Sequence, residues 1–229
     1  MSGKIIAVGN LKGGTGKSTV AVNLACALRG SGKVKVAVVD ADAQGTASDW
    51  AAKGRLGLTV HALPFEESEN TGHGGGSASG RDGEAWGTVV ERLRLEHDFV
   101  VIDLPPQLGD AILNALVAAN LFVVPVTASG ADLKATTKAI ELLRRARARR
   151  DDGRPACLLV PSRVDRRTAA GKEIEAVLHD FGEPVAPAIG QRTAHVDAFT
   201  AGEWVGSYAP RSAAHGEIDV LAAIVKRVK

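Results

Sequence analysis

Short runs of apolar residues alternate along this chain with longer segments in which apolar residues recur every three or four positions. The first run, residues 5–8, leads into a glycine-rich turn, and Val20, Leu24 and Leu28 then share one face of a predicted helix. The same rhythm returns several times. It predicts strands at residues 34–39, 98–104, 121–127, 156–160 and 184–189, and helices within 111–120, from 86, across 131–150 and across 216–229.

At least five alternations of strand and helix predict an α/β fold: one doubly wound, mainly parallel sheet with helices on both faces. The 229 residues fit a single domain over 1–229. Residues of about 66–84 are rich in Gly and Ser and lack apolar periodicity. Because the sheet pattern resumes on both sides, we interpret them as a flexible surface insertion and not as a domain linker.

Composition narrows the possible partners and compartments. The formal net charge is +2, so any attraction to nucleic acid must come from a local basic patch. Cys26 and Cys157 form no metal or redox spacing, which favours two buried thiols in a reducing compartment. Residues 1–8 lack a secretion signal, and the uncharged run 111–131 changes from helical to strand periodicity midway. We therefore expect a cytoplasmic protein without a membrane span.

The glycine-rich turn carries the strongest chemical signal. Gly13, Gly14 and Gly16 allow successive N–H groups to converge on an anion, and the following helix adds its positive end. Lys17 can reach the β- and γ-phosphates of a nucleotide, and the Ser18 hydroxyl can ligate Mg²⁺. Strand, loop and helix in this order predict a P-loop nucleotide site. The residues expected around the phosphates are Lys12, Gly13, Gly14, Thr15, Gly16, Lys17, Ser18 and Thr19.

One position departs from a standard Walker A loop. Leu11 stands where that loop has a glycine, and a second lysine, Lys12, comes directly before Gly13. The resulting KGGTGKS sequence resembles the deviant Walker A motif of the ParA/MinD family of ATPases. The resemblance implies that Lys12 acts catalytically by reaching across a homodimer to the ATP of the other subunit.

Carboxylates end two of the predicted strands. Asp40 and Asp42 are two residues apart and project the same way from an extended backbone, so one could hold the water shell of a metal and the other the attacking water. Asp103 ends the run 98–104 in the Walker B arrangement. We predict Mg²⁺ ligation by Ser18, Asp40 and Asp103. By resemblance to the family, Asp42 is the carboxylate associated with hydrolysis.

The C-terminal half offers candidate contacts to base and DNA. By resemblance, Ser162 and Arg163 lie near the adenine, and Arg192 contributes to nonspecific DNA binding. Lys226 and Arg227, at the basic end of the final helix, are further DNA candidates. Five arginines between residues 144 and 150 are either solvated cations at a helix end or a phosphate-contacting patch.

The resemblance, closest to small ParA-type partition and positioning ATPases, implies a complete cycle. The protein would dimerise around two Mg·ATP, bind nucleoid DNA nonspecifically, and be released when a ParB-like or McdB-like adaptor stimulates hydrolysis. It would thereby position a plasmid, a chromosome or a protein-shelled compartment, without stable membrane association. Three alternatives remain open: a MinD-like membrane-cycling regulator, a metabolic P-loop phosphotransferase, and a DNA scaffold with negligible turnover.

Overall fold

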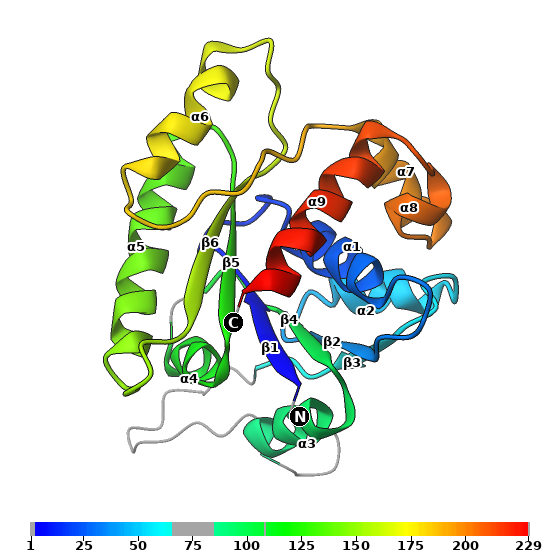
Figure 1. Ribbon diagram of the computed structural model, residues 1–229, viewed down its shortest axis with the longest axis vertical. Coiled ribbons are helices and arrows are strands. Elements are labelled where there is room, and N and C mark those ends of the chain that lie inside the picture. Colours follow the sequence, from blue (N-terminus) through cyan, green and yellow to red (C-terminus); the bar gives the residue numbers. More distant parts are fainter. Residues whose placement is uncertain (1–2, 66–84, 108, 229) are drawn as a thin grey trace.

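The computed structural model describes residues 3–65, 85–107 and 109–228, so the predicted insertion at 66–84 lies outside the described residues. Within them, six strands form one sheet in the order β3-β2-β4-β1-β5-β6, and every pairing is parallel (Figure 1). From the central β1 the chain winds to one edge, returns through β4 and continues from β5 to the other edge. The strands are β1 (Lys4–Val8), β2 (Val36–Asp40), β3 (Thr59–Ala62), β4 (Phe99–Asp103), β5 (Leu121–Val126) and β6 (Ala156–Pro161).

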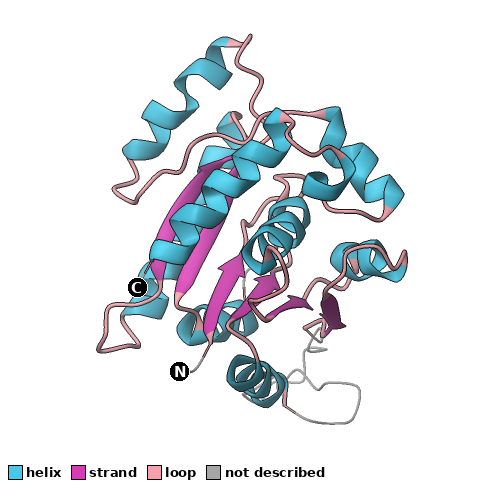
Figure 2. Cartoon of the chain, turned by 45° about the vertical axis from the view of Figure 1, so that its right-hand side comes forward, coloured by secondary structure: helices cyan, strands magenta, loops and turns pink. Residues whose placement is uncertain are grey.

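Helices cover both faces of this sheet (Figure 2). They are α1 (Lys17–Arg29), α2 (Thr46–Ala52), α3 (Trp86–Glu96), α4 (Asp110–Ala118), α5 (Gly130–Arg147), α6 (Ala169–His179), α7 (Thr193–Ala201), α8 (Val205–Tyr208) and α9 (Ala213–Arg227). One apolar core joins the sheet to α3, α4, α5 and α6, and a second joins its other face to α1, α2, α7, α8 and α9. The predicted doubly wound fold is confirmed.

Side-chain alternation in the strands explains why two cores form. In β1, Ile5 and Ala7 belong to the first core, whereas Ile6 and Val8 belong to the second. A parallel strand buried on both faces has a nearly continuous apolar run, as residues 5–8 of β1 show. Because successive side chains point to opposite faces, four consecutive residues supply apolar contacts to both layers of helices.

The register brings the predicted carboxylates together. In the ladder, Asp40 at the end of β2 lies opposite Asp103 at the end of β4, and Asp103 lies opposite Val8 at the end of β1. The glycine-rich loop begins directly after Val8. The phosphate loop and both strand-end aspartates therefore meet at the carboxyl edge of the sheet, where open α/β sheets bind ligands.

The apolar pattern predicted a strand at residues 184–189, and this prediction was wrong. Residues 184–189 run beside β6 but form no regular strand; they make an isolated parallel bridge between Val185 and Leu159. Ala186 and Ile189 each donate a backbone hydrogen bond toward β6. Pro187, between them, has no N–H to donate. A proline at this position interrupts the ladder, so an apolar run alone was not sufficient evidence for a strand.

Candidate nucleotide-binding site

The loop between β1 and α1 has the backbone that an anion site requires. Gly14 and Gly16 have φ of 79° and 89°, in the left-handed region that favours glycine. A side chain at Gly16 would also place its Cβ 2.9 Å from the hydroxyl oxygen of Ser162. Gly16 precedes α1 without providing a side-chain cap, so the first N–H groups of the helix are available to a phosphate.

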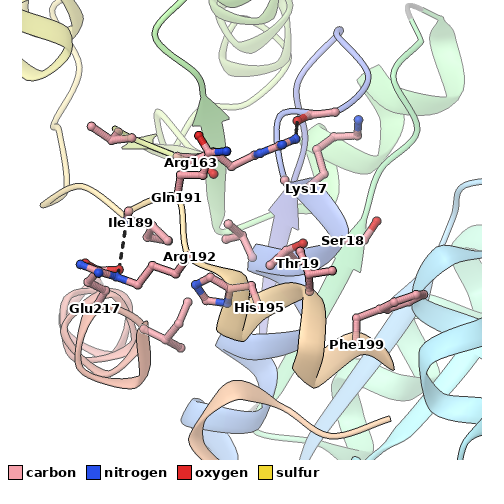
Figure 3. A pocket seen from close by; sticks show the side chains of 18 of the residues that line it. Lys17, Ser18, Thr19, Arg163, Ile189, Gln191, Arg192, His195, Phe199 and Glu217 are labelled. Atoms are coloured by element: carbon pink, nitrogen blue, oxygen red, sulfur yellow. Dashed lines mark hydrogen bonds and ion pairs between the residues drawn. The ribbon is translucent and has the colours of Figure 1, made fainter. Parts of the chain in front are cut away.

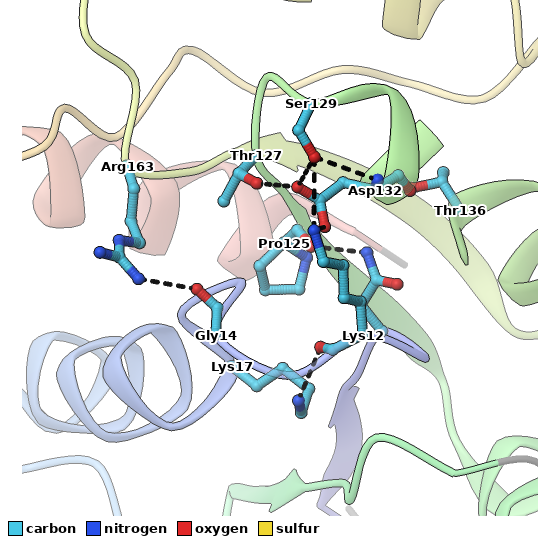
Figure 4. A network of polar contacts seen from close by, with 10 residues as sticks. Lys12, Gly14, Lys17, Pro125, Thr127, Ser129, Asp132, Thr136 and Arg163 are labelled. Carbon is cyan, nitrogen blue, oxygen red and sulfur yellow. Dashed lines mark hydrogen bonds and ion pairs between the residues drawn. The ribbon is translucent and has the colours of Figure 1, made fainter. Parts of the chain in front are cut away.

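The two lysines of the loop point to different places (Figure 4). Lys17, at the start of α1, exposes only 7% of its surface and donates to the carbonyl of Lys12 at 3.2 Å. Burial lowers the pKa of Lys17, while the nearby carboxylates of Asp103 and Asp42 act in the opposite direction. A buried ammonium beside open glycine N–H groups is well placed to neutralise a phosphate that enters the loop.

The side chain of Lys12 points away from that of Lys17 and pairs with another residue of the same chain. Its ammonium forms a 2.8 Å ion pair with Asp132, near the start of α5, and lies 3.4 Å from the Ser129 hydroxyl. Thr127 and Ser129 both donate hydroxyl hydrogen bonds to the same carboxylate. Burial alone would raise the pKa of Asp132, but the Lys12 ammonium and the two hydroxyls outweigh it and hold the pKa below its usual range. We call Lys12, Thr127, Ser129 and Asp132 the lysine latch.

Asp103 is a buried carboxylate without a regular partner. It is fully buried, and within the described residues neither of its oxygens accepts a hydrogen bond of ordinary geometry. Burial raises the pKa of Asp103 to about 7; the nearby Ser18 hydroxyl opposes this shift, and the Asp40 carboxylate adds to it. An orphaned carboxylate beside a phosphate loop fits the predicted ligand for the water shell of Mg²⁺.

Asp40 is engaged differently. One oxygen accepts hydrogen bonds from the Ser48 N–H at 2.7 Å and the Ser48 hydroxyl at 2.8 Å, and the other accepts from the Asp42 N–H at 3.3 Å. The carboxylate therefore holds the turn that leads into α2. Its predicted part in the metal site stays a prediction, and any contact with Mg²⁺ would have to share oxygens with that turn.

Asp42 lies on the turn that Asp40 organises. It is half-buried, lines the same hollow as Lys17, and accepts a hydrogen bond from the Gln44 N–H at 3.0 Å. The carboxylate is close enough to oppose the lowering of the Lys17 pKa that burial causes. This placement leaves Asp42 near the phosphate end of the hollow, where a water could be oriented.

We expect Asp42→Ala to lower the ATP hydrolysis rate by about 10²–10⁴-fold, the usual contribution of a positioned base. ATP affinity should be retained, because Asp42 is proposed to orient water and not to hold phosphate. Single-turnover hydrolysis and equilibrium dialysis measure the two effects separately. Asp42→Asn keeps the size of the side chain and serves as the matched variant. Normal hydrolysis in both would move the role to Asp40 or to a water held by the backbone.

Ser162 and Arg163, the predicted base contacts, both reach the phosphate loop. Ser162 is buried against Gly16, and the Arg163 guanidinium donates to the carbonyl of Gly14 at 2.8 Å. Arg163 adopts a φ of 54°, which is uncommon for a residue with a side chain. The loop after β6 thus supports the shape of the phosphate loop. A contact with the base stays a prediction for both residues.

A hollow of about 1030 Å³ extends from the phosphate loop to the segment after residue 188 (Figure 3). Away from the phosphate loop it is bordered by Arg192 and Glu217, whose side chains pair at 2.6 Å, and by Ile189, Gln191 and His195. The volume is in the range of small-molecule sites that enclose most of their ligand. The phosphate loop therefore opens into a space large enough for a nucleotide.

The structure does not bring the predicted DNA contacts together. Arg192 lies at the hollow and pairs with Glu217 in the first turns of α9, whereas Lys226 and Arg227 are exposed in its last turn. Lys226 lies nine positions after Glu217, about 14 Å along the helix axis. The arginines of 144–150 also divide, because Arg147 pairs with a glutamate and Arg150 with an aspartate. Of this cluster, Arg144, Arg145 and Arg149 are exposed.

Residues 6–204 match the family described as the CobQ/CobB/MinD/ParA nucleotide binding domain. The chain belongs to this family. The resemblance to ParA and MinD predicted from the KGGTGKS loop is thereby confirmed, and the family's members are nucleotide-binding ATPases.

Individual relatives cover nearly the whole chain. It is 34% identical over 222 residues to the maintenance of carboxysome distribution protein A of Gloeobacter kilaueensis, covering 94% of this chain and 90% of that protein. It is 32% identical over 241 residues to the chromosome-partitioning ATPase Soj of Thermus thermophilus, covering 98% and 96%. In fold it is similar to a variant of McdA from Cyanothece in complex with ATP, with a TM-score of 0.73, 14% identity and coverage of 100% and 98%.

Two features of the described residues bear on the alternatives. None of their helices combines the length and apolar character needed to cross a membrane. Nor do these residues contain a group of three or more His, Cys, Asp or Glu side chains able to hold a metal ion. A magnesium site of the predicted kind does not need such a group, because Mg²⁺ keeps several waters and takes phosphate oxygens from its nucleotide.

Two residues of the site were missed by the sequence analysis. Asp132 belongs to the lysine latch. The pattern Ser129-x-x-Asp132 marks the start of α5, where the Ser129 hydroxyl caps the helix, but it does not indicate the pairing with Lys12. His195 lies at the hollow with both ring nitrogens buried and unpartnered among the described residues. Nothing in its local sequence distinguishes it from a histidine on an ordinary helix.

Proposed function

We propose that this protein is a ParA-type ATPase that dimerises around two Mg·ATP, binds DNA nonspecifically in that state, and is released by adaptor-stimulated hydrolysis. In this proposal it is cytoplasmic and associated with the nucleoid, and it positions a plasmid, a chromosome or a protein-shelled cargo. The named relatives support two of these cargoes, because one maintains carboxysome distribution and another partitions chromosomes. A ParB-like or McdB-like adaptor would supply the stimulation.

The observation that carries the proposal is the different placement of the two lysines of the phosphate loop. Lys17 borders the hollow, whereas Lys12 is not among its lining residues and is paired with Asp132 instead. In this proposal Lys17 serves the nucleotide of its own subunit. The second lysine is positioned on a different side of the loop, from which a dimer partner could recruit it.

The residues present fit Mg·ATP. The open glycine loop, the buried Lys17 ammonium and the hollow of about 1030 Å³ match a nucleoside triphosphate. The orphaned Asp103 carboxylate and the Ser18 hydroxyl would hold the metal. Mg²⁺, when bound, would neutralise charge on the phosphate oxygens. Lys17 and the N–H groups of α1 would orient the terminal phosphates, and Asp42 would accept a hydrogen bond from the attacking water.

The same geometry ranks the alternatives. A metabolic phosphotransferase needs Lys17 and Asp103 but gives Lys12 no task, because that lysine lies off the hollow. A MinD-like regulator shares the nucleotide chemistry and differs in what its dimer binds. A DNA scaffold with negligible turnover would leave Asp42 without a role. Sedimentation with plasmid DNA and, separately, with anionic liposomes, each in ATP, ADP and no nucleotide, separates a DNA binder from a membrane binder and from a phosphotransferase that binds neither. The rate of ATP turnover then separates the proposed ATPase from the scaffold.

We expect charge reversal at Lys226 and Arg227 together to weaken ATP-dependent DNA binding while leaving ATP affinity unchanged. Both residues are exposed at the end of α9 remote from the hollow. Each lost phosphate contact should reduce the slope of log affinity against log salt by about 0.9. Filter binding of DNA across a salt series measures both the loss of DNA affinity and the change in its salt slope.

Two further charge reversals locate the DNA surface. Arg192→Glu should also weaken DNA binding, but its pairing with Glu217 beside the hollow requires that ATP affinity be measured in parallel. Reversal of the exposed Arg144 and Arg145 on α5 tests the rival patch. A larger loss there would move the DNA surface to α5. Binding that does not change with salt in the parent protein would contradict a phosphate-tracking surface altogether.

A further inference from the structure

His195 has a polar side chain that the proposed reaction does not use. It lies in the first turn of α7, exposes 8% of its surface and borders the hollow. Within the described residues neither ring nitrogen has a hydrogen-bond partner. Leaving a buried donor and acceptor unpaired costs stability, so such a group needs a reason.

The groups around His195 are already committed to one another. Arg192 donates to Glu217 at 2.6 Å and 3.2 Å, and the second oxygen of Glu217 accepts from the Gly190 N–H at 3.0 Å. Neither the guanidinium nor the carboxylate therefore turns to the imidazole. His195 lines a hollow large enough for a nucleotide, so a ligand bound there is an available partner for its unmet hydrogen bonds.

The position of His195 identifies which part of a nucleotide it would meet. Phosphates belong at the glycine loop and the start of α1, and the hollow extends from there past Thr19 to Ile189 and Gln191. Figure 3 draws the His195 ring between the side chains of Thr19 and Arg192. The middle of the hollow is where the sugar of a nucleoside triphosphate lies when its phosphates occupy one end.

The chemistry of the ring fits a hydroxyl better than a phosphate. Burial lowers the pKa of His195, and Arg192 adds to this effect while Glu217 opposes it. The neutral imidazole has one donor and one acceptor nitrogen, and a hydroxyl group can serve either. A phosphate oxygen only accepts and would favour the charged ring.

We propose that His195 hydrogen-bonds a sugar hydroxyl of the bound nucleotide and so selects ribonucleotides over deoxyribonucleotides. This inference rests on the proposed function, since it takes the hollow to be the nucleotide site. It names a specificity residue on α7, far in sequence from the phosphate loop.

The experiment is a binding cycle that combines protein variants with sugar analogues. Affinities for Mg·ATP, Mg·2′-deoxy-ATP and Mg·3′-deoxy-ATP are measured by calorimetry for the parent, His195→Phe and His195→Gln. The parent should bind ATP about 10-fold more tightly than one of the deoxy analogues. His195→Phe should bind ATP as weakly as that analogue and should bind the analogue as the parent does. His195→Gln, which keeps a donor and an acceptor, should recover part of the difference.

Controls keep the outcome tied to the hydrogen bond. His179→Phe, an exposed histidine at the end of α6, should bind all three nucleotides as the parent does. Thermal melts without nucleotide check that each variant folds. If the parent does not bind ATP, the proposed function fails. If it binds ATP and both deoxy analogues equally, or if His195→Phe weakens all three equally, the sugar contact is refuted while the proposed function stands.

Discussion

Lys17→Ala should abolish nucleotide binding. Lys17 is the buried ammonium at the start of α1, and it borders the hollow at its phosphate end. Hydrogen bonds between an ammonium and a phosphate are charge-assisted, and a buried site strengthens them because water does not screen the charges. Each such bond contributes roughly 1.5–3 kcal/mol, so losing several of them should raise the dissociation constant by at least about 100-fold.

Equilibrium dialysis with Mg·ATP and Mg·ADP measures the effect. Lys53→Ala is a useful control, because Lys53 is an exposed lysine that donates to a backbone carbonyl near the end of α7 and does not border the hollow. A thermal melt of the free variant separates lost binding from lost folding. Unchanged ATP affinity in a folded Lys17→Ala protein would refute the P-loop assignment.

The parts of the fold that the sequence predicted are those in which apolar pattern and burial coincide. Five strands are short apolar runs that the structure buries on both faces, so the apolar run alone was enough to predict each of them. These strands are β1, β2, β4, β5 and β6. β3 was missed because its four residues, TVHA, are half-exposed at the edge of the sheet. Edge strands are covered on one side only, and their sequences accordingly carry less of the pattern.

Some residues of the candidate site could likewise be predicted from the sequence, and others could not. The phosphate loop was predictable because its residues are consecutive, and the strand-end aspartates were predictable because parallel strands end at one edge. The lysine latch was not, since Lys12 and Asp132 are 120 residues apart and meet only because β5 lies next to β1. His195 reaches the hollow through the packing of α7 against the second core. Contacts made by tertiary packing leave little trace in local sequence.

Lys12→Ala should remove ATP-dependent dimerisation while leaving nucleotide binding largely intact. Two triphosphates brought face to face repel, and buried like charge is costly unless it is paired. One lysine from each subunit would neutralise part of that charge only in the closed dimer. The variant should remain monomeric with Mg·ATP in light scattering, and it should lose ATP-dependent DNA binding and adaptor-stimulated turnover.

The lysine latch supplies the matched variant that this experiment needs. Asp132 is almost fully buried and holds the Lys12 ammonium, whose side chain is 40% exposed. Before Lys12 can act on a second subunit it must leave this ion pair. Asp132→Asn keeps the size of the side chain and an acceptor for the Thr127 and Ser129 hydroxyls but removes the charge. It should therefore dimerise with ATP at least as readily as the parent.

The two variants separate a role between subunits from a role within one. If Lys12 only supports its own loop through Asp132, breaking the pair from either side has the same consequence, and both variants lose the same property. If Lys12 acts on the partner's nucleotide, Lys12→Ala loses dimerisation and Asp132→Asn keeps or strengthens it. A Lys12→Ala protein that dimerises with ATP as the parent does would require the ParA-type cycle to be abandoned. In that case Lys17, Asp42 and Asp103 would remain as the site of a P-loop enzyme that works without a sandwich dimer.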